Sequence, residues 1–241
     1  MESSSTRTQT AAENNKEKAT RIFNFRFWSV FFILVVPSTI LLLSPFFCKQ
    51  HCKKLPVYFN EVTEKGDTIE HHIPHFAFEN QAGQVITHDS MRGNITVVDF
   101  FFTTCPGICK TLSSEMQQLQ EKVKDIKDIK LISFTVDPQV DSVPVLADYA
   151  KLYKAIPNKW HFLTSRNDSV LYDVIKKGFK APVYVDPKGV EKVTHSPMFY
   201  LVDKDLRIRA FVDMTQDTGR KKILELIDVL RCEYRNTNAK N

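Results

Sequence analysis

An apolar segment that leads into two cysteines constrains this chain more than any other feature. Residues 95–102 read Ile-Thr-Val-Val-Asp-Phe-Phe-Phe, and Cys105-Pro-Gly-Ile-Cys109 follows two residues later. A nearly continuous apolar run of this length predicts a strand at the centre of a sheet that is covered on both faces. Apolar residues then recur at helical spacing up to Val123. The cysteines therefore lie at a strand-to-helix turn, where a redox or soft-metal site is expected.

The spacing of the two cysteines favours a metal site. Thiols at positions i and i+4 of a helix share one face, with Cβ atoms about 5–6 Å apart, and local unwinding would also allow a disulfide. Pro106 is expected at the first helical position and Cys105 near the N-cap, where the helix dipole favours the thiolate. Soft thiolates select Cu(I), and the imidazole of His195 would complete a Cys2His set for copper. A structural disulfide or two ordinary buried cysteines is the alternative.

Composition excludes several other classes of protein. The chain has 241 residues and a formal net charge of +5, with Lys and Arg interleaved with acidic residues. Such a pattern leaves no nucleic-acid footprint, so no nucleic-acid partner is expected. Seven glycines and the absence of a Gly-rich phosphate-binding motif argue against a nucleotide-binding loop. Eighteen phenylalanines indicate a well-filled core, with some of them in a membrane.

The N-terminal part of the chain predicts a membrane anchor. Residues 1–26 are polar and expected to be disordered, whereas residues 27–47 contain no charged side chain. About 20 apolar residues span a bilayer, so residues 27–47 are predicted to form one uncleaved transmembrane helix. A cleaved signal peptide would have a shorter apolar core and a small-residue cleavage site. We expect a linker over residues 48–70, one soluble domain over 71–232 and a polar tail over 233–241.

The predicted location is a bacterial inner membrane. Positive residues flank the span on both sides, so charge alone does not orient it. A domain that handles copper or thiols fits an oxidising compartment better than the cytosol. The N-terminus is therefore expected in the cytoplasm and the soluble domain in the periplasm. A leader with acidic residues and few arginines argues against mitochondrial import.

The soluble part alternates strands and helices. Hairpins are predicted over residues 76–87 and 198–212, strands over 95–102, 131–136 and 160–163, and helices over 107–123, 143–154, 169–178 and 221–231. This order predicts an α/β fold: a thioredoxin-like sandwich with a central mixed sheet flanked by helices, an N-terminal hairpin extension, and one transmembrane helix before it.

Four segments together carry a family resemblance. Residues 99–109, 133–144, 160–164 and 194–203 resemble, in order and approximate spacing, the motifs of the Sco/SenC family. The resemblance covers roughly residues 75–230. It implies a thioredoxin-like fold and a copper site made by Cys105, Cys109 and His195. Asp137 matches a family acid beside the site, although it is equally well explained as a turn residue before Pro138.

The resemblance also implies a function and partners. The protein would deliver copper to the CuA centre in subunit II of cytochrome c oxidase, or reduce the thiols of that centre. Its partners would be subunit II or another periplasmic copper acceptor, a copper donor chaperone and the inner membrane. The donor, the acceptor and the oxidation state of copper do not follow from the sequence.

Two further predictions concern His195 and the other histidines. In thioredoxin-like domains a loop with a cis-proline packs against the dithiol turn, so the bond between Ser196 and Pro197 is predicted to be cis. That would bring His195 toward the cysteines. The His71-His72 pair is interpreted as solvated rather than metal-binding, and His161, within a predicted strand, as structural.

A second pair of cysteines, Cys48 and Cys52, repeats the spacing of the first pair just after the predicted span. A local disulfide or two spare thiols is the simpler interpretation. The sharper hypothesis makes this pair a transient copper or redox partner of the main site. Cys232, near the expected end of the last helix, receives no function.

Two activities compete with copper delivery. A thiol-disulfide reductase would use Cys105 as the attacking thiol and Cys109 as the resolving thiol, although the three-residue spacer and Thr104 do not favour it. A peroxiredoxin-like peroxidase shares the fold but would need an arginine beside the reactive cysteine. A purely structural domain is the least favoured.

Overall fold

The computed structural model describes residues 28, 31–39, 52–62, 64–181, 183–185, 191–193 and 196–238. The chain divides into two units, Met1–His51 and Cys52–Asn241. In the first unit, residues 28 and 31–39 are helical. Within the described ranges, no helix reaches the length and apolar character needed to cross a membrane. The polar tail 1–26 and the other residues of the predicted span, 27, 29, 30 and 40–47, lie outside the described residues.

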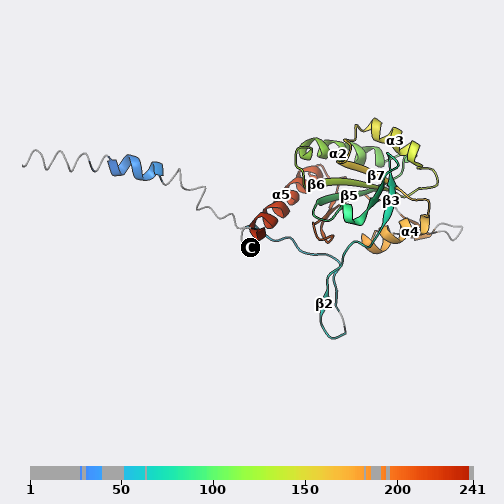
Figure 1. Ribbon diagram of the computed structural model, residues 1–241, viewed down its shortest axis with the longest axis horizontal. Helices are drawn as coiled ribbons and strands as arrows, with labels where there is room; N and C mark the ends of the chain where they lie inside the picture. The colour runs from blue at the N-terminus through green and yellow to red at the C-terminus, as the bar shows by residue number, and fades with distance from the viewer. Residues whose placement is uncertain are drawn as a thin grey trace, which may run out of the picture. The chain divides into compact units, whose positions relative to one another are not determined.

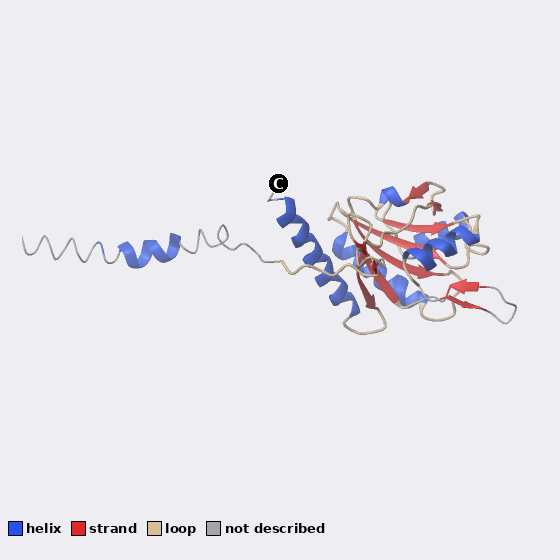
Figure 2. Ribbon diagram, turned by 90° about the horizontal axis from the view of Figure 1, so that it is seen from below, coloured by secondary structure: helices blue, strands red, loops and turns tan. Residues whose placement is uncertain are grey.

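The second unit is built on a seven-stranded mixed sheet with the order β11-β10-β5-β6-β7-β3-β4 (Figures 1 and 2). The three central strands β5, β6 and β7 are parallel, and their outer neighbours β10 and β3 run antiparallel to them. The edge strands β11 and β4 pair antiparallel with β10 and β3, so they run in the same direction as the central strands. The strands are β3 (Ala77–Asn80), β4 (Val85–Thr87), β5 (Ile95–Phe101), β6 (Ile129–Thr135), β7 (Trp160–Thr164), β10 (Met198–Val202) and β11 (Ile208–Asp213). This architecture confirms the predicted central strand and both predicted hairpins.

Helices cover both faces of the sheet. One face packs against α2 (Cys109–Val123), α3 (Val143–Leu152) and α5 (Gly219–Asn238), and the other against α4 (Asp168–Asp173) with its π-helical continuation η2 (Val174–Gly178). A short 3-10 helix, η1 (His88–Ser90), follows β4. The predicted apolar stripe of α2 is buried: Leu112, Met116, Leu119 and Val123 are each at most 1% exposed. The helical spacing of large apolar residues therefore predicted correctly which face of α2 is buried.

Two small hairpins were not predicted. β1 (Glu61–Val62) and β2 (Thr68–Ile69) pair within the segment expected to be a linker, and this hairpin projects from the sheet (Figure 1). β8 (Val183–Val185) pairs with β9 (Glu191–Val193) between η2 and β10. Strands of two or three residues leave no apolar period in the sequence, which explains why both hairpins were missed.

The first residues of the second unit are fastened to α5. Cys52 forms a disulfide with Cys232, with Cα atoms 5.7 Å apart and a sequence separation of 180. The interpretation of Cys48 and Cys52 as a local disulfide or two spare thiols is therefore wrong for Cys52, and Cys48 lies outside the described residues. Cys232 is not at the end of its helix, because α5 continues to Asn238. This disulfide joins residues that are distant in sequence, and it forms because residues 52–58 pack beside α5.

A buried arginine holds the same segment. Arg209, 2% exposed, donates to the carbonyl oxygens of Leu55 (2.6 Å) and Pro56 (3.0 Å). Its guanidinium also pairs with Asp203 and Glu233, both at 2.9 Å. The segment before β1 therefore packs on β11 and α5 rather than leaving the domain as a free linker.

Candidate metal centre

The two central cysteines lie at the carboxyl end of β5. The backbone N–H of Cys105 donates to the Phe102 carbonyl (3.3 Å), which closes a turn directly after the strand. The helix begins at Cys109, with Ile108 as its N-cap, and not at Gly107. Pro106 is consequently outside the helix and Cys105 is not at the N-cap, which corrects the predicted placement.

Cys105 and Cys109 are both free thiols and both buried, at 3% and 1% exposure. Each thiol alters the pKa of the other, so the turn places the two side chains close together. The structure thus places the two predicted sulfur ligands in one site. Two adjacent thiols in an apolar setting suit a soft metal ion or a reversible disulfide.

The environments of the two thiols differ. Burial opposes ionisation of Cys105, but hydrogen bonds from the Cys109 thiol and from nearby backbone N–H groups, with the charge of Lys110, lower the pKa of Cys105. Burial is also the largest influence on Cys109, where it raises the pKa to about 12, and the neighbouring Cys105 and Asp99 add to that rise. Cys105 is therefore the thiol that ionises first.

A buried acid that sequence reasoning missed holds the dithiol turn. Asp141, fully buried, accepts hydrogen bonds from the backbone N–H of Thr103 (3.2 Å) and from the hydroxyl groups of Thr103 and Thr135. Burial raises the pKa of its carboxyl group despite these bonds. Asp141 joins the loop after β6 to the start of the dithiol turn. Nothing in the sequence distinguished it from the nearby Asp137.

Asp137 itself is partly exposed, and its backbone carbonyl accepts from the N–H groups of Val140 and Asp141 (3.1 and 2.9 Å). Its own N–H donates to the Thr135 hydroxyl (3.0 Å). These bonds are those of a turn residue. A role of the Asp137 carboxylate beside a bound metal stays a prediction.

A second buried acid lies under the site. Asp99 on β5 is 1% exposed, and Oδ1 accepts from the Ser133 hydroxyl (2.5 Å), which in turn accepts from the indole N–H of Trp160 (2.9 Å). Burial raises the pKa of Asp99 to about 7. Alternation along β5 directs Asp99 to the face that α2 covers, consistent with its electrostatic effect on Cys109.

The third predicted ligand, His195, lies outside the described residues. The residues that follow it are described: the Pro197 carbonyl accepts from the N–H of Met214 (3.0 Å). The described chain contains no cis peptide bond, so the predicted cis bond between Ser196 and Pro197 is wrong. A trans bond before proline is intrinsically favoured by about 0.5–1 kcal/mol. Without His195, the described residues contain no group of three or more His, Cys, Asp or Glu that could hold a metal ion.

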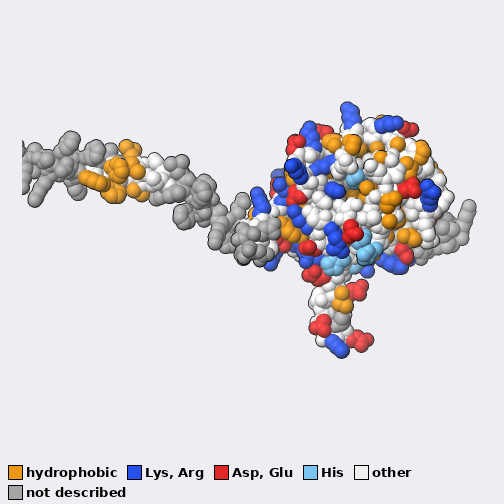
Figure 3. Space-filling view, in the orientation of Figure 1, with side chains coloured by type: hydrophobic (Ala, Val, Ile, Leu, Met, Phe, Trp, Pro, Cys, Tyr) orange, Lys and Arg blue, Asp and Glu red, His pale blue; other side chains and the backbone are white. Residues whose placement is uncertain are grey.

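His71, His72 and His161 have structural partners. His161 is buried on β7, and its Nδ1 accepts from the Asn80 amide (3.2 Å), which confirms its structural interpretation. Ring nitrogens of His71 and His72 lie 2.7 and 2.8 Å from the carbonyl oxygens of Gly178 and Asp205. Histidine side chains gather at the base of the β1–β2 hairpin in Figure 3.

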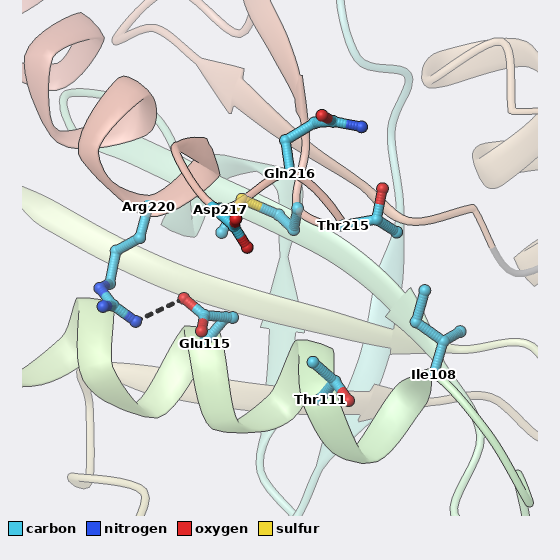
Figure 4. A pocket seen from close by; sticks show the side chains of 8 residues that line it. Ile108, Thr111, Glu115, Thr215, Gln216, Asp217 and Arg220 are labelled. Carbon is cyan, nitrogen blue, oxygen red and sulfur yellow. Dashed lines mark hydrogen bonds and ion pairs between the residues drawn. The ribbon is translucent and has the colours of Figure 1, made fainter.

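A polar pocket of about 350 Å³ borders the dithiol turn (Figure 4). One wall is the face of α2 that bears Ile108, Thr111 and Glu115, and the other is the loop from Met214 to the first turn of α5. Arg220 of α5 crosses between the walls to Glu115 (2.6 Å). The first turn of α5 thus lies beside the start of α2.

A strand, a dithiol turn and a helix on a mixed sheet with helices on both faces define a thioredoxin-like dithiol protein. The sequence assigns it more closely: the model of the SCO1/SenC family matches residues 63–229. The chain belongs to the SCO1/SenC family, as its motifs predicted.

Known proteins similar to this chain support the family assignment. A SCO1 protein homolog of Bacillus subtilis is 34% identical over 143 residues, which cover 59% of this chain and 74% of that protein. The structure of BsSco, a member of the Sco family of cytochrome c oxidase assembly proteins with an identified disulfide switch, is 29% identical, with a TM-score of 0.60 over 74% of this chain and 98% of that one.

A relative of known structure binds copper. ScoI of Bradyrhizobium japonicum, solved with copper bound, is 22% identical with a TM-score of 0.53 over 65% of this chain and 98% of that one. This likeness confirms the thioredoxin-like fold.

Proposed function

We propose that this protein binds copper through Cys105, Cys109 and His195 and delivers it during assembly of cytochrome c oxidase. The acceptor is the CuA centre of subunit II or another periplasmic copper protein, and a copper donor chaperone loads the site. The observation that carries the proposal is the pair of free, buried thiols that lie close together in the turn at the carboxyl end of β5. Membership of the SCO1/SenC family, in which relatives bind copper, supports it.

The donor set fits copper as cargo. Two thiolates form a soft site that prefers Cu(I), and an imidazole from His195 extends the site to Cu(II). The ligands must be deprotonated to bind metal, so loading releases protons and requires the reduced dithiol. The lowered pKa of Cys105 provides the first thiolate. The turn itself is held by Asp141, which limits the movement of Cys105 relative to Cys109.

The same proposal includes a membrane anchor. Residues 27–47 carry no charge and match the length of a bilayer span, so they hold the protein in a bacterial inner membrane with the second unit in the periplasm. The disulfide between Cys52 and Cys232 supports an oxidising compartment for that unit. Carbonate extraction of membranes and protease access to residues 52–241 from the periplasmic side test this part.

Copper titration tests the site. The full chain, reduced and metal-free in detergent, is titrated anaerobically with Cu(I) against a chromogenic chelator. Tight one-to-one binding is expected, with loss in Cys105→Ser and Cys109→Ser and weakening in His195→Ala. His71→Ala is the matched control, because His71 bonds a backbone carbonyl instead. Unchanged affinity in the two cysteine variants would contradict the proposal.

A thiol-disulfide reductase is the second candidate. The observation that favours it is the contrast between Cys105, whose pKa is lowered, and Cys109, whose pKa is raised to about 12. An attacking thiol needs thiolate character, and a buried partner can resolve the mixed disulfide. Both activities can coexist, because CuA cysteines must be reduced before they take copper. Rapid disulfide exchange without tight copper binding would select this candidate.

A further inference from the structure

The disulfide between Cys52 and Cys232 is distinct from the dithiol and lies at the start of the second unit. Contacts around it bind the same stretch of chain. The N–H of Leu55 donates to Glu233 (3.3 Å), Arg209 donates to the carbonyl groups of Leu55 and Pro56, and the N–H of Tyr58 donates to Ile208 (2.9 Å). The chain is therefore attached to α5 and β11 along residues 52–58, once by a covalent bond.

This attachment lies at the amino end of the central strand. β10 runs antiparallel to β5, with Val202 beside Thr96, so the turn after β10 lies where β5 begins. The N–H of Gly93, just before β5, donates to Lys204 of that turn (3.0 Å). Arg209 pairs with Asp203 in the same turn. Cys105, by contrast, follows the carboxyl end of β5. The attachment and the dithiol therefore lie at opposite ends of the strand.

Helix α5 spans the same distance. Its first turn bears Arg220, which reaches Glu115 of α2 beside the dithiol turn (Figure 4). Cys232 lies thirteen positions after Gly219, the first residue of the helix. At 1.5 Å per residue the disulfide lies about 20 Å along the helix from the dithiol end. The seven residues of β5, at about 3.3 Å each, give a similar separation.

We propose that the Cys52–Cys232 disulfide is a permanent cross-link that fixes where the anchored chain enters the domain, so that the dithiol is presented at the opposite end. The part about presentation rests on the proposed membrane anchor and copper delivery. Only residues 48–51 separate Cys52 from the predicted span, and the five extended steps from residue 47 to Cys52 reach about 18 Å at most. The partner that fits is a membrane-bound acceptor whose metal ligands stand on the order of 20 Å or more above the bilayer.

The cross-link forms by thiol-disulfide exchange. An oxidised disulfide protein of the same compartment accepts two electrons: the two thiols lose their protons, one S–S bond forms between Cys52 and Cys232, and the S–S bond of the oxidant becomes two thiols. The Cys105 and Cys109 thiols take no part. The second unit therefore keeps one disulfide while its dithiol is reduced and ready for copper.

Peptide mapping tests the cross-link. The full chain, reduced mildly until the dithiol is free, is alkylated under native conditions and digested without further reduction. Mass spectrometry should show one peptide pair joined through Cys52 and Cys232. Cys105 and Cys109 should be alkylated when reagent is also present after the protein is denatured. Recovery of alkylated Cys52 and Cys232, or of Cys52 joined to Cys48, would overturn the proposal.

Matched variants separate the cross-link from the copper site. In Cys52→Ser/Cys232→Ser, the Tm should fall by roughly 5–15 °C, the range for a long-loop disulfide in a domain of this size. Its Cu(I) affinity should stay within about twofold of the wild type, because the site lies about 20 Å away. Cys48→Ser is the control and should change neither value. A tenfold loss of copper affinity in the double variant would contradict the assignment, and strong reductant added to the wild type should reproduce its Tm.

Distance measurements in vesicles test the presentation. A fluorescent amino acid replaces Thr111, near the dithiol, or Lys53, near the cross-link, in the full chain inserted into vesicles with an acceptor dye on the lipid headgroups. The label at position 111 should lie about 20 Å farther from the bilayer than the label at position 53, and the difference should shrink when the cross-link is removed. Equal distances in the cross-linked protein would overturn the presentation. Failure to insert would instead contradict the proposed anchor, while the mapping still decides the cross-link.

Discussion

The carboxyl group of Asp99 is buried near the dithiol without a full set of hydrogen-bond partners. Oδ1 accepts from Ser133, but Oδ2 is buried and has no hydrogen-bond partner in the described part of the chain. A buried carboxylate without a full set of partners is unfavourable, and its neutral form is favoured instead. This explains why burial raises the pKa of Asp99 from its ordinary value of 3.8 to about 7.

Replacing Asp99 should change how stability depends on pH. The folded protein keeps the Asp99 proton between pH 3.8 and about 7, where the unfolded chain has lost it, so the wild type loses stability as the pH rises through this window. Asp99→Asn removes that loss. Relative to wild type, the free energy of unfolding of the variant should rise by up to roughly 4 kcal/mol from pH 4 to pH 8. Urea denaturation at several pH values measures it, with the exposed Asp148→Asn as control.

His161 should make the stability of the fold depend on pH under acidic conditions. Burial, with a smaller effect of Lys130, lowers the pKa of His161 to about 4. Since the unfolded chain takes up this proton near pH 6.5 and the folded protein only near pH 4, stability is full above pH 6.5 and falls as the pH drops to 4. The loss amounts to roughly 3 kcal/mol. His161→Gln should flatten this part of the stability curve, whereas the exposed His72→Gln should follow wild type.

At the scale of elements, the loop after β6 positions the dithiol turn through one carboxylate. Asp141 bonds the backbone and hydroxyl of Thr103, two residues before Cys105. Polar groups that hold a ligand loop typically affect metal affinity by 10- to 100-fold. Asp137 lies four residues away but makes only turn contacts through its backbone. The two acids should therefore differ in effect.

Asp141→Asn should loosen the turn and weaken Cu(I) binding at least tenfold, since an amide cannot accept all three hydrogen bonds as well as a carboxylate does. Faster alkylation of Cys105 in the metal-free protein provides a readout that is independent of copper. Asp137→Asn is the matched control. If it weakens binding more than Asp141→Asn does, the acid beside the metal is Asp137 after all.

The elements that the sequence predicted well are those with strong periodicity. β5, β6 and α2 have continuous or helical apolar patterns, and their bounds differ from the expectation by two residues or fewer. Only the part of the site formed by residues close together in the sequence was predicted. Cys105 and Cys109 are close in sequence, whereas Asp141 contacts Thr103 across 38 residues and Cys52 meets Cys232 across 180. Pairing over such separations depends on tertiary packing, which no local pattern encodes.

At the scale of the whole molecule, Arg209 joins segments from three parts of the chain. It binds Leu55 and Pro56 in the segment before β1, Asp203 in the turn between β10 and β11, and Glu233 in helix α5. Arg209 is 2% exposed and Asp203 is fully buried. Removing one member of a buried ion pair is costly because the other charge stays behind in a medium of low polarity.

Arg209→Met should lower the free energy of unfolding by about 3–5 kcal/mol, as measured by urea denaturation. Adding Glu233→Gln should recover part of that loss, because Glu233 loses its ion pair with Arg209 whereas Asp203 keeps its pair with Arg207. The control is Arg220→Met, which breaks the half-exposed pair with Glu115 and should cost about 1 kcal/mol or less. Equal losses in the two arginine variants would contradict a special role for Arg209.

The disulfide also makes the second unit a closed ring of chain. Every loop between Cys52 and Cys232 lies inside this ring, including the projecting β1–β2 hairpin. A protease that cuts one of these loops opens the ring but releases no fragment, so the nicked protein should migrate at full mass until the disulfide is reduced. Damage to an exposed loop therefore leaves the two cysteines of the dithiol on the same covalent molecule as residues 1–51.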